Sequence, residues 1–110
     1  MANIDVGSIF KSIEDQAKAL AQKLFKQYTE QAVSDAKDFL EKTKEDLKGW
    51  IEELARGEMT KDEFESLVQG QADLAEMHAL KQAGLAAVQI ETFTNGLLDI
   101  VVNAAFAAIP

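Results

Sequence analysis

The sequence contains no cysteine, and its one proline is the last of its 110 residues. Without cysteine the chain cannot form a disulfide framework, a thiolate nucleophile, an iron–sulfur cluster or a cysteine-ligated zinc site. Without an internal proline, no residue from 1 to 109 is barred from the interior of a helix. The two absences therefore exclude disulfide-stapled folds and favour helix along the whole chain.

Basic side chains are also scarce, with 11 lysines and arginines against 19 aspartates and glutamates, for a formal net charge of −8. This charge argues against a nucleic-acid partner, because binding to phosphates requires clustered lysine and arginine. The first residues contain neither the basic segment nor the apolar run of a secretory signal, which predicts a cytoplasmic location. The hydrophobic fraction of 47% is too high for a disordered chain. The length fits a single domain over residues 1–110.

Glycine is absent between Ser8 and Lys48, and apolar residues recur through the first half at the helical period of about 3.7 residues. This apolar row consists of Ile9, Ile13, Ala17, Leu20, Leu24, Tyr28, Ala32, Ala36, Phe39, Leu47, Ile51 and Leu54, with Thr43 as its polar member. Acid–base pairs spaced by four, such as Asp38–Lys42 and Glu52–Arg56, are typical of an exposed helix face. The first half therefore predicts one helix over about residues 5–56.

The strongest local signal is a helix end and a helix start close to the middle of the chain. Gly57 can adopt the left-handed conformation that ends a helix. Thr60 and Glu63 have the spacing of a capping box, in which each side chain accepts a hydrogen bond from the backbone of the other. Met59 and Phe64 occupy the positions of a hydrophobic staple. These residues predict a turn between two helices.

Because the turn is central, the sequence predicts an all-α fold, a long antiparallel helical hairpin over about 5–56 and 60–109. Residues facing each other in this hairpin have numbers that sum to about 117, so Leu20 is expected near Leu97. A break at 94–96 is the alternative to a continuous second helix, since Asn-Gly is a turn signal. Continuity is favoured by a polar stripe at four-residue spacing: Glu91, Asn95, Asp99 and Asn103. We expect this stripe to face solvent, the alternative being a polar seam inside an oligomer.

The second arm becomes strongly apolar over residues 85–109, and no lysine or arginine follows Lys81. One neighbouring helix would leave more apolar surface uncovered than monomers usually expose. We therefore expect oligomerisation to complete a helical bundle, with another copy or a protein partner on this face. The residues expected to form it are Leu85, Val88, Ile90, Phe93, Leu97, Leu98, Ile100, Val101 and Phe106.

Residues that carry enzyme chemistry are sparse. His78 is the single histidine and has no carboxylate three or four residues away, so the Glu-x-x-His pattern of helical metal sites is absent. The acids near the turn do not match a calcium loop, and the glycines are scattered singly, which leaves no loop to bind a phosphate. The sequence predicts no catalytic residue, no metal site and no cofactor.

These observations predict a non-enzymatic structural or interaction protein that forms a dimer or higher homo-oligomer through its apolar C-terminal helix, or binds a protein partner there. The alternative is a lipid-associating protein of pore-forming or granule-coat type that inserts or lays down residues 85–109. That segment is long enough to cross a bilayer of about 30 Å. Glu91 and Asp99 oppose this alternative, because a carboxylate within the bilayer is costly.

Overall fold

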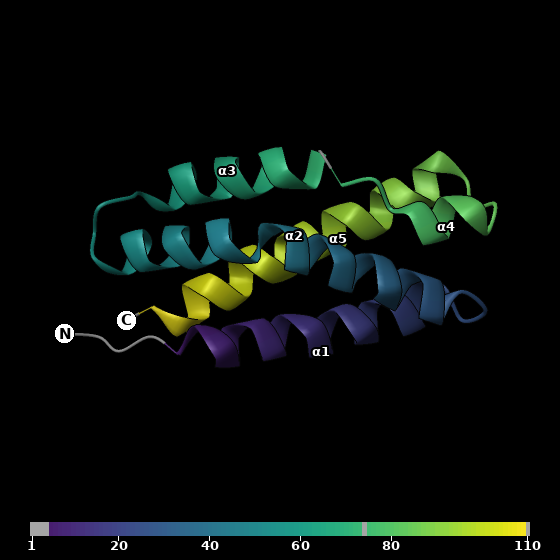
Figure 1. Ribbon diagram of the computed structural model, residues 1–110, viewed down its shortest axis with the longest axis horizontal. Coiled ribbons are helices and arrows are strands. Elements are labelled where there is room, and N and C mark those ends of the chain that lie inside the picture. The colour runs from purple at the N-terminus through teal and green to yellow at the C-terminus, as the bar shows by residue number, and fades with distance from the viewer. Residues whose placement is uncertain (1–4, 74, 110) are drawn as a thin grey trace.

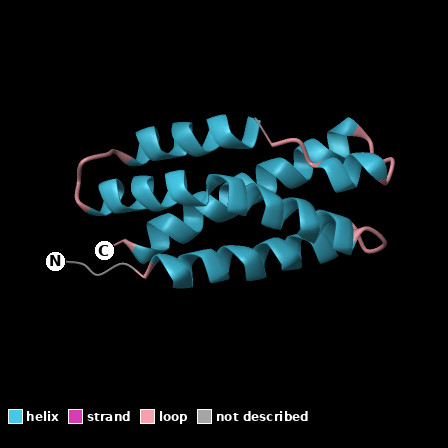
Figure 2. Cartoon of the chain, in the orientation of Figure 1, coloured by secondary structure: helices cyan, strands magenta, loops and turns pink. Residues whose placement is uncertain are grey.

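The computed structural model describes residues 5–73 and 75–109, and over these ranges it contains helices and no strands. The expected all-α class is therefore confirmed (Figure 2). The helices are α1 (Val6–Leu24), α2 (Thr29–Ala55), α3 (Lys61–Asp73), α4 (His78–Gln82) and α5 (Ala87–Ala108).

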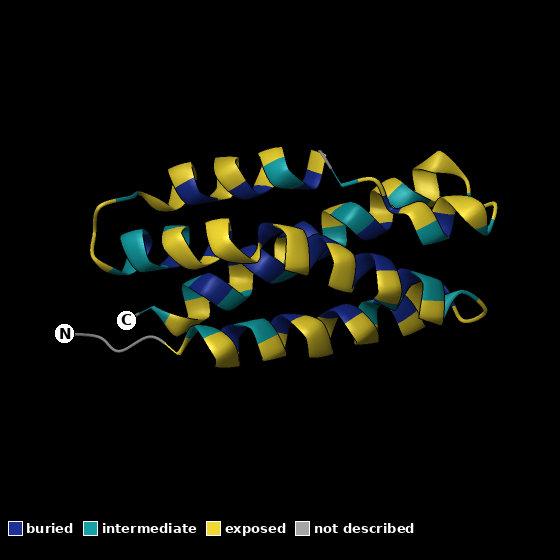
Figure 3. Cartoon of the chain, viewed as in Figure 1, coloured by how far each residue is buried: buried dark blue, intermediate teal, exposed yellow. Residues whose placement is uncertain are grey.

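The helices form an elongated bundle of 46 × 22 × 19 Å, in which the successive columns α1, α2, α3 with α4, and α5 alternate in direction (Figure 1). α1 packs on α2 and α5, α3 packs on the same two helices, and α4 packs on α2. The buried sides of the columns face one another along the length of the bundle (Figure 3). A single chain therefore encloses its own core.

The predicted continuous helix over 5–56 is wrong, because the chain leaves the helix after Leu24 and turns back before Thr29. The backbone carbonyl of Phe25 accepts hydrogen bonds from the Thr29 hydroxyl at 2.7 Å and from the Tyr28 N–H at 3.1 Å. The Phe25 ring is buried edge-to-face against Phe93, with 5.7 Å between the ring centroids. Tertiary burial thus overrides a local sequence that is compatible with helix.

The second arm is also interrupted, at residues 75–77 and at 83–86. The second interruption occurs at Gly84, whose φ is +88°. The N–H of Gly84 bonds the Lys81 carbonyl at 3.1 Å, and the N–H of Leu85 bonds the Leu80 carbonyl at 3.3 Å. These two bonds form a Schellman motif, which ends α4.

The suspected break at 94–96 is absent, since α5 runs through Asn95 and Gly96. Gly96 lies under the Leu20 side chain, and a Cβ built at position 96 would be 2.7 Å from Leu20 Cδ2. This glycine therefore permits a close approach between α1 and α5. It does not end a helix.

Three contacts between the two halves of the chain lie close to the register expected for the hairpin. Leu20 lies at Gly96, Phe25 packs on Phe93, and Asp35 bonds the backbone of Leu80. In each pair the residue numbers sum to within a few of 117. The hairpin is thus folded in half, so that the α1/α5 unit packs against a second unit of α2 with α3 and α4, which we call the α2–α4 unit.

Candidate functional site

The face expected to receive a partner is mostly buried within the chain itself. Within this set Phe93, Leu97, Leu98 and Val101 are buried, Leu85, Ile90, Ile100 and Phe106 are partly buried, and Val88 is 71% exposed. The expected single uncovered face over 85–109 is therefore wrong, because α1 and α3 of the same chain pack on α5. Oligomerisation is not needed to close this core. What remains accessible is the start of the face, around Val88.

The polar stripe lies on the outside of α5. Glu91, Asn95, Asp99 and Asn103 are all exposed. In the single chain the stripe faces outward. It lines no polar seam within the chain.

The turn after α2 has the geometry that its sequence predicts. Gly57 has a φ of +77°, and the N–H of Glu58 bonds the Glu53 carbonyl at 2.9 Å. Thr60 and Glu63 form the capping box, with both reciprocal hydrogen bonds at 3.1 Å. Of the two expected staple residues, Phe64 is buried, and Met59 is partly buried against the core.

Charged side chains on the surface of the same turn pair with one another. The Arg56 guanidinium donates to both carboxylate oxygens of Glu58, at 2.9 and 3.2 Å, and lies 3.9 Å from Glu52. The hydrogen bonds and the charge of Arg56 lower the pKa of Glu58, and Glu58 in turn raises the pKa of Arg56. All three side chains are about half exposed to solvent, so this cluster encloses no site.

Asp35 is the one buried acidic side chain of the described ranges, at 6% exposure. One of its oxygens accepts the N–H of Ala79 at 2.9 Å, and the other accepts the N–H of Leu80 at 2.8 Å. These amides belong to the first turn of α4, where Met77 precedes the helix in a left-handed conformation and provides no side-chain cap. Asp35 of α2 therefore caps α4 across the bundle. The sequence analysis missed this role, because the two partners are more than 40 residues apart.

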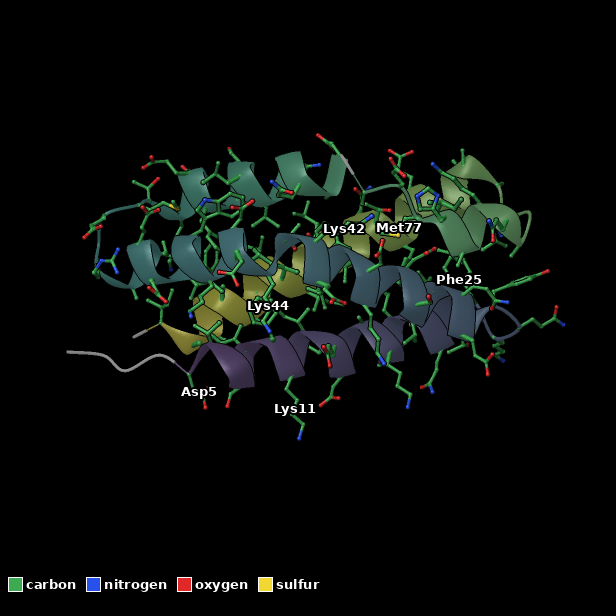
Figure 4. The ribbon with its side chains drawn as sticks, in the orientation of Figure 1. Asp5, Lys11, Phe25, Lys42, Lys44 and Met77 are labelled. Atoms are coloured by element: carbon green, nitrogen blue, oxygen red, sulfur yellow. The ribbon has the colours of Figure 1, made fainter. Side chains whose placement is uncertain are left out.

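A cavity of about 120 Å³ lies beside this cap. It is lined by Asp35, Asp38, Phe39, Lys42, Thr43, Gln71, Ala75, Glu76 and Met77, of which Figure 4 labels Lys42 and Met77. Lys42 is paired with Asp38 at 3.1 Å, and the Thr43 hydroxyl donates to the Phe39 carbonyl at 2.8 Å. With both oxygens of Asp35 also engaged, this lining offers no nucleophile–base pair.

His78 lies outside this cavity and contacts the Glu76 carboxylate. In a continuous helix Glu76 and His78 would lie on different faces, but residues 75–77 are not helical, which lets the two side chains meet. Both side chains are more than half exposed. No group of three or more histidine, aspartate or glutamate side chains in 5–73 and 75–109 could hold a metal ion.

A second hollow, which we call the α3–α5 groove, lies where α3 ends and α5 begins, and its volume is about 440 Å³. The apolar residues that line it are Ala72, Ala75, Leu85, Ala87 and Ile90. Its polar rim consists of Gln69, Asp73, Lys81, Glu91, Thr94 and Asn95. Val88 is not part of this lining, but it follows Ala87 directly in the chain and is exposed. The groove exists because the third column is interrupted after Asp73, which leaves the first turns of α5 only partly covered.

None of the described helices has the length and apolar character needed to span a membrane. No protein-family model, curated protein or solved structure matches the chain.

Proposed function

We propose that this protein is a non-enzymatic interaction protein that self-associates through the α3–α5 groove and the adjacent Val88. The observation that supports the proposal most directly is Val88, which is 71% exposed and follows Ala87, a residue that lines the groove. The other large apolar side chains described as exposed, Leu24 and Leu67, are at 37% and 38%. An apolar protrusion next to an apolar hollow is typical of a surface that is covered in an assembly.

A second copy of the chain is the occupant that this surface fits. The same patch carries an exposed side chain, Val88, and a hollow lined by small and aliphatic residues such as Ala72 and Ile90. In a twofold contact each copy presents the same patch, so Val88 of each copy can enter the groove of the other. The patch is therefore complementary to itself.

The charges on the rim also suit a homotypic contact. Lys81 is on the rim together with the carboxylates of Asp73 and Glu91. A twofold contact allows the lysine of one copy to approach a carboxylate of the other, so two molecules of net charge −8 can meet where both signs are present. This arrangement reduces the repulsion that the net charge would otherwise cause.

The test is Val88→Lys, which places a flexible cation where an apolar side chain must be buried. The matched control is Asn103→Lys, which adds the same charge at an exposed position of the same helix, outside the groove. Molar mass is measured by light scattering over a concentration series. We expect the unchanged protein and Asn103→Lys to approach the dimer mass together as the concentration rises, while the molar mass of Val88→Lys does not change with concentration. An unchanged protein that is monomeric throughout the series would refute the proposal.

A further inference from the structure

The chain passes twice between the α1/α5 unit and the α2–α4 unit, through residues 25–28 and through residues 83–86. Both connections lie at the same end of the bundle, opposite the turn that follows α2 (Figure 1). The two units can therefore separate by hinging at that one end, without breaking the contacts inside either unit.

The contacts inside each unit are those of a straight hairpin. Leu20 at Gly96 and Phe25 on Phe93 hold the first unit, and Asp35 bonded to Leu80 holds the second. In both units the numbers of two facing residues sum to about 117. A straight hairpin can therefore keep these pairings while both connections extend.

Residues 25–28 carry no local obstacle to becoming helical. They contain neither glycine nor proline, and no side chain caps the start of α2 at Tyr28. The apolar row also continues in phase across the connection, from Leu20 and Leu24 through Tyr28 to Ala32. The fold-back is thus held mainly by tertiary contacts, which another molecule can supply equally well.

We propose that two copies of this chain exchange units. In the exchanged dimer, residues 25–28 and 83–86 become helical and each molecule extends into a straight hairpin. The α1/α5 unit of one molecule then packs against the α2–α4 unit of the other, with the contacts that the monomer makes within itself. Exchange of identical elements is a common route to dimers, because the exchanged interface already exists in the monomer.

This inference goes beyond the proposed function, since it does not require the α3–α5 groove. A dimer formed at the groove joins two closed molecules and separates on dilution. An exchanged dimer separates only after its bundle opens, so it persists on dilution at temperatures where the bundle is folded. The two kinds of dimer are therefore distinguishable by their response to dilution.

Two glycines provide a matched test. Gly84 and Gly57 both have positive φ, at +88° and +77°, both end a helix, and a Cβ built at either meets nothing within 4 Å. Gly84 lies in a connection that straightens on exchange, whereas Gly57 lies in the turn that both forms keep. Gly84→Ala therefore strains only the closed monomer, and Gly57→Ala strains both forms equally.

Each variant is unfolded, refolded at high concentration and separated by size with light-scattering detection, then diluted and measured again. Alanine in the left-handed conformation is disfavoured by about five-fold or more. Because each exchanged dimer forms from two strained monomers, Gly84→Ala should raise the association constant of the exchanged dimer by about 25-fold. Gly57→Ala should show the dimer fraction of the unchanged protein. Circular dichroism checks that both variants are helical.

The double variant Gly84→Ala/Val88→Lys separates the exchange from the groove contact. We expect it to retain the dilution-resistant dimer. Three results would overturn the exchange: a monomeric Gly84→Ala, a Gly57→Ala dimer fraction equal to that of Gly84→Ala, or a Gly84→Ala dimer that disappears in the double variant.

Discussion

At the scale of single residues, Asp35 is the side chain that holds α4 in place. Its carboxylate is buried, and it satisfies two amides at the start of α4, where Met77 cannot. Because α4 is only five residues long, it has little helical stability of its own. One side chain of α2 therefore fixes the path of the chain between α3 and α5.

We predict that Asp35→Ala destabilises the protein by about 2–3 kcal/mol, because it leaves two amide groups without their charged acceptor. The control is Asp38→Ala, which removes an exposed carboxylate that is paired with Lys42 one turn along the same helix. The loss of that surface ion pair should cost less than about 1 kcal/mol. Urea unfolding measures both values. Equal stabilities for the two variants would contradict the capping role of Asp35.

The pKa of Glu58 is a second prediction at this scale. Arg56 holds that pKa below its usual 4.5 through hydrogen bonds and charge. The contribution of Glu58 to stability is therefore complete above pH 4.5 and is lost as the pH falls through the lowered folded-state pKa. We expect Arg56→Gln to return the pKa of Glu58 towards its usual value, as measured by NMR titration of the side-chain carboxyl carbon. An unchanged pKa would show that Arg56 is not the cause.

The residue patterns predicted some of these contacts and missed others for a physical reason. Thr60 and Glu63 are three residues apart, so their capping box is determined locally and was predictable. Asp35 sits within an amphipathic helix and has the sequence context of a solvent-facing acid. Its burial depends on amides more than 40 residues away, which no local pattern reports.

At the scale of helices, the glycines separate into two kinds. Gly57 and Gly84 end helices with positive φ, whereas Gly70 and Gly96 lie inside α3 and α5. A Cβ built at Gly70 meets nothing within 4 Å, while one built at Gly96 meets Leu20. Gly70 thus only lowers the stability of its helix, whereas Gly96 is needed for the close packing of α1 on α5.

We predict that Gly70→Ala stabilises the protein by about 1 kcal/mol, the difference in helix propensity between the two residues. Gly96→Ala gains the same propensity but must displace the Leu20 side chain, so its net gain should be smaller or negative. Thermal unfolding of the two variants under identical conditions gives the comparison. A larger gain at position 96 than at position 70 would contradict the close approach of α1 and α5.

A helix boundary could be predicted from the sequence only where a local helix-end signal, such as a glycine, is present. Gly57 ends a helix as its sequence indicates, and Gly84, followed by Leu85, ends α4 with the same Schellman motif, although the apolar pattern around it predicts a continuous helix. The break at residues 25–28 has no such mark, because no residue there disfavours helix. It is imposed by the packing of the α1/α5 unit on the α2–α4 unit, through α1 on α2 and α3 on α5, which are contacts between distant parts of the sequence.

At the scale of the whole molecule, the apolar excess of residues 85–109 correctly indicated a helix that must be covered. The covering surface is supplied by α1 and α3 of the same chain. Periodicity and register predicted a hairpin, and the contacts of Leu20 at Gly96 and of Phe25 on Phe93 lie close to its expected register. They did not predict that it folds in half, because its straight and folded forms share the same pairings within each unit.

The alternating direction of the columns has a mechanical consequence. The Val6 end of α1 and the Ala108 end of α5 lie at the same end of the bundle, on neighbouring antiparallel helices (Figure 1). A pulling force applied between those two points separates the helices one turn at a time, as in unzipping. A force applied between Val6 and the opposite end, near Gly84, must slide whole rows of side chains past one another. The same bundle is therefore mechanically weak along one pulling direction and strong along another.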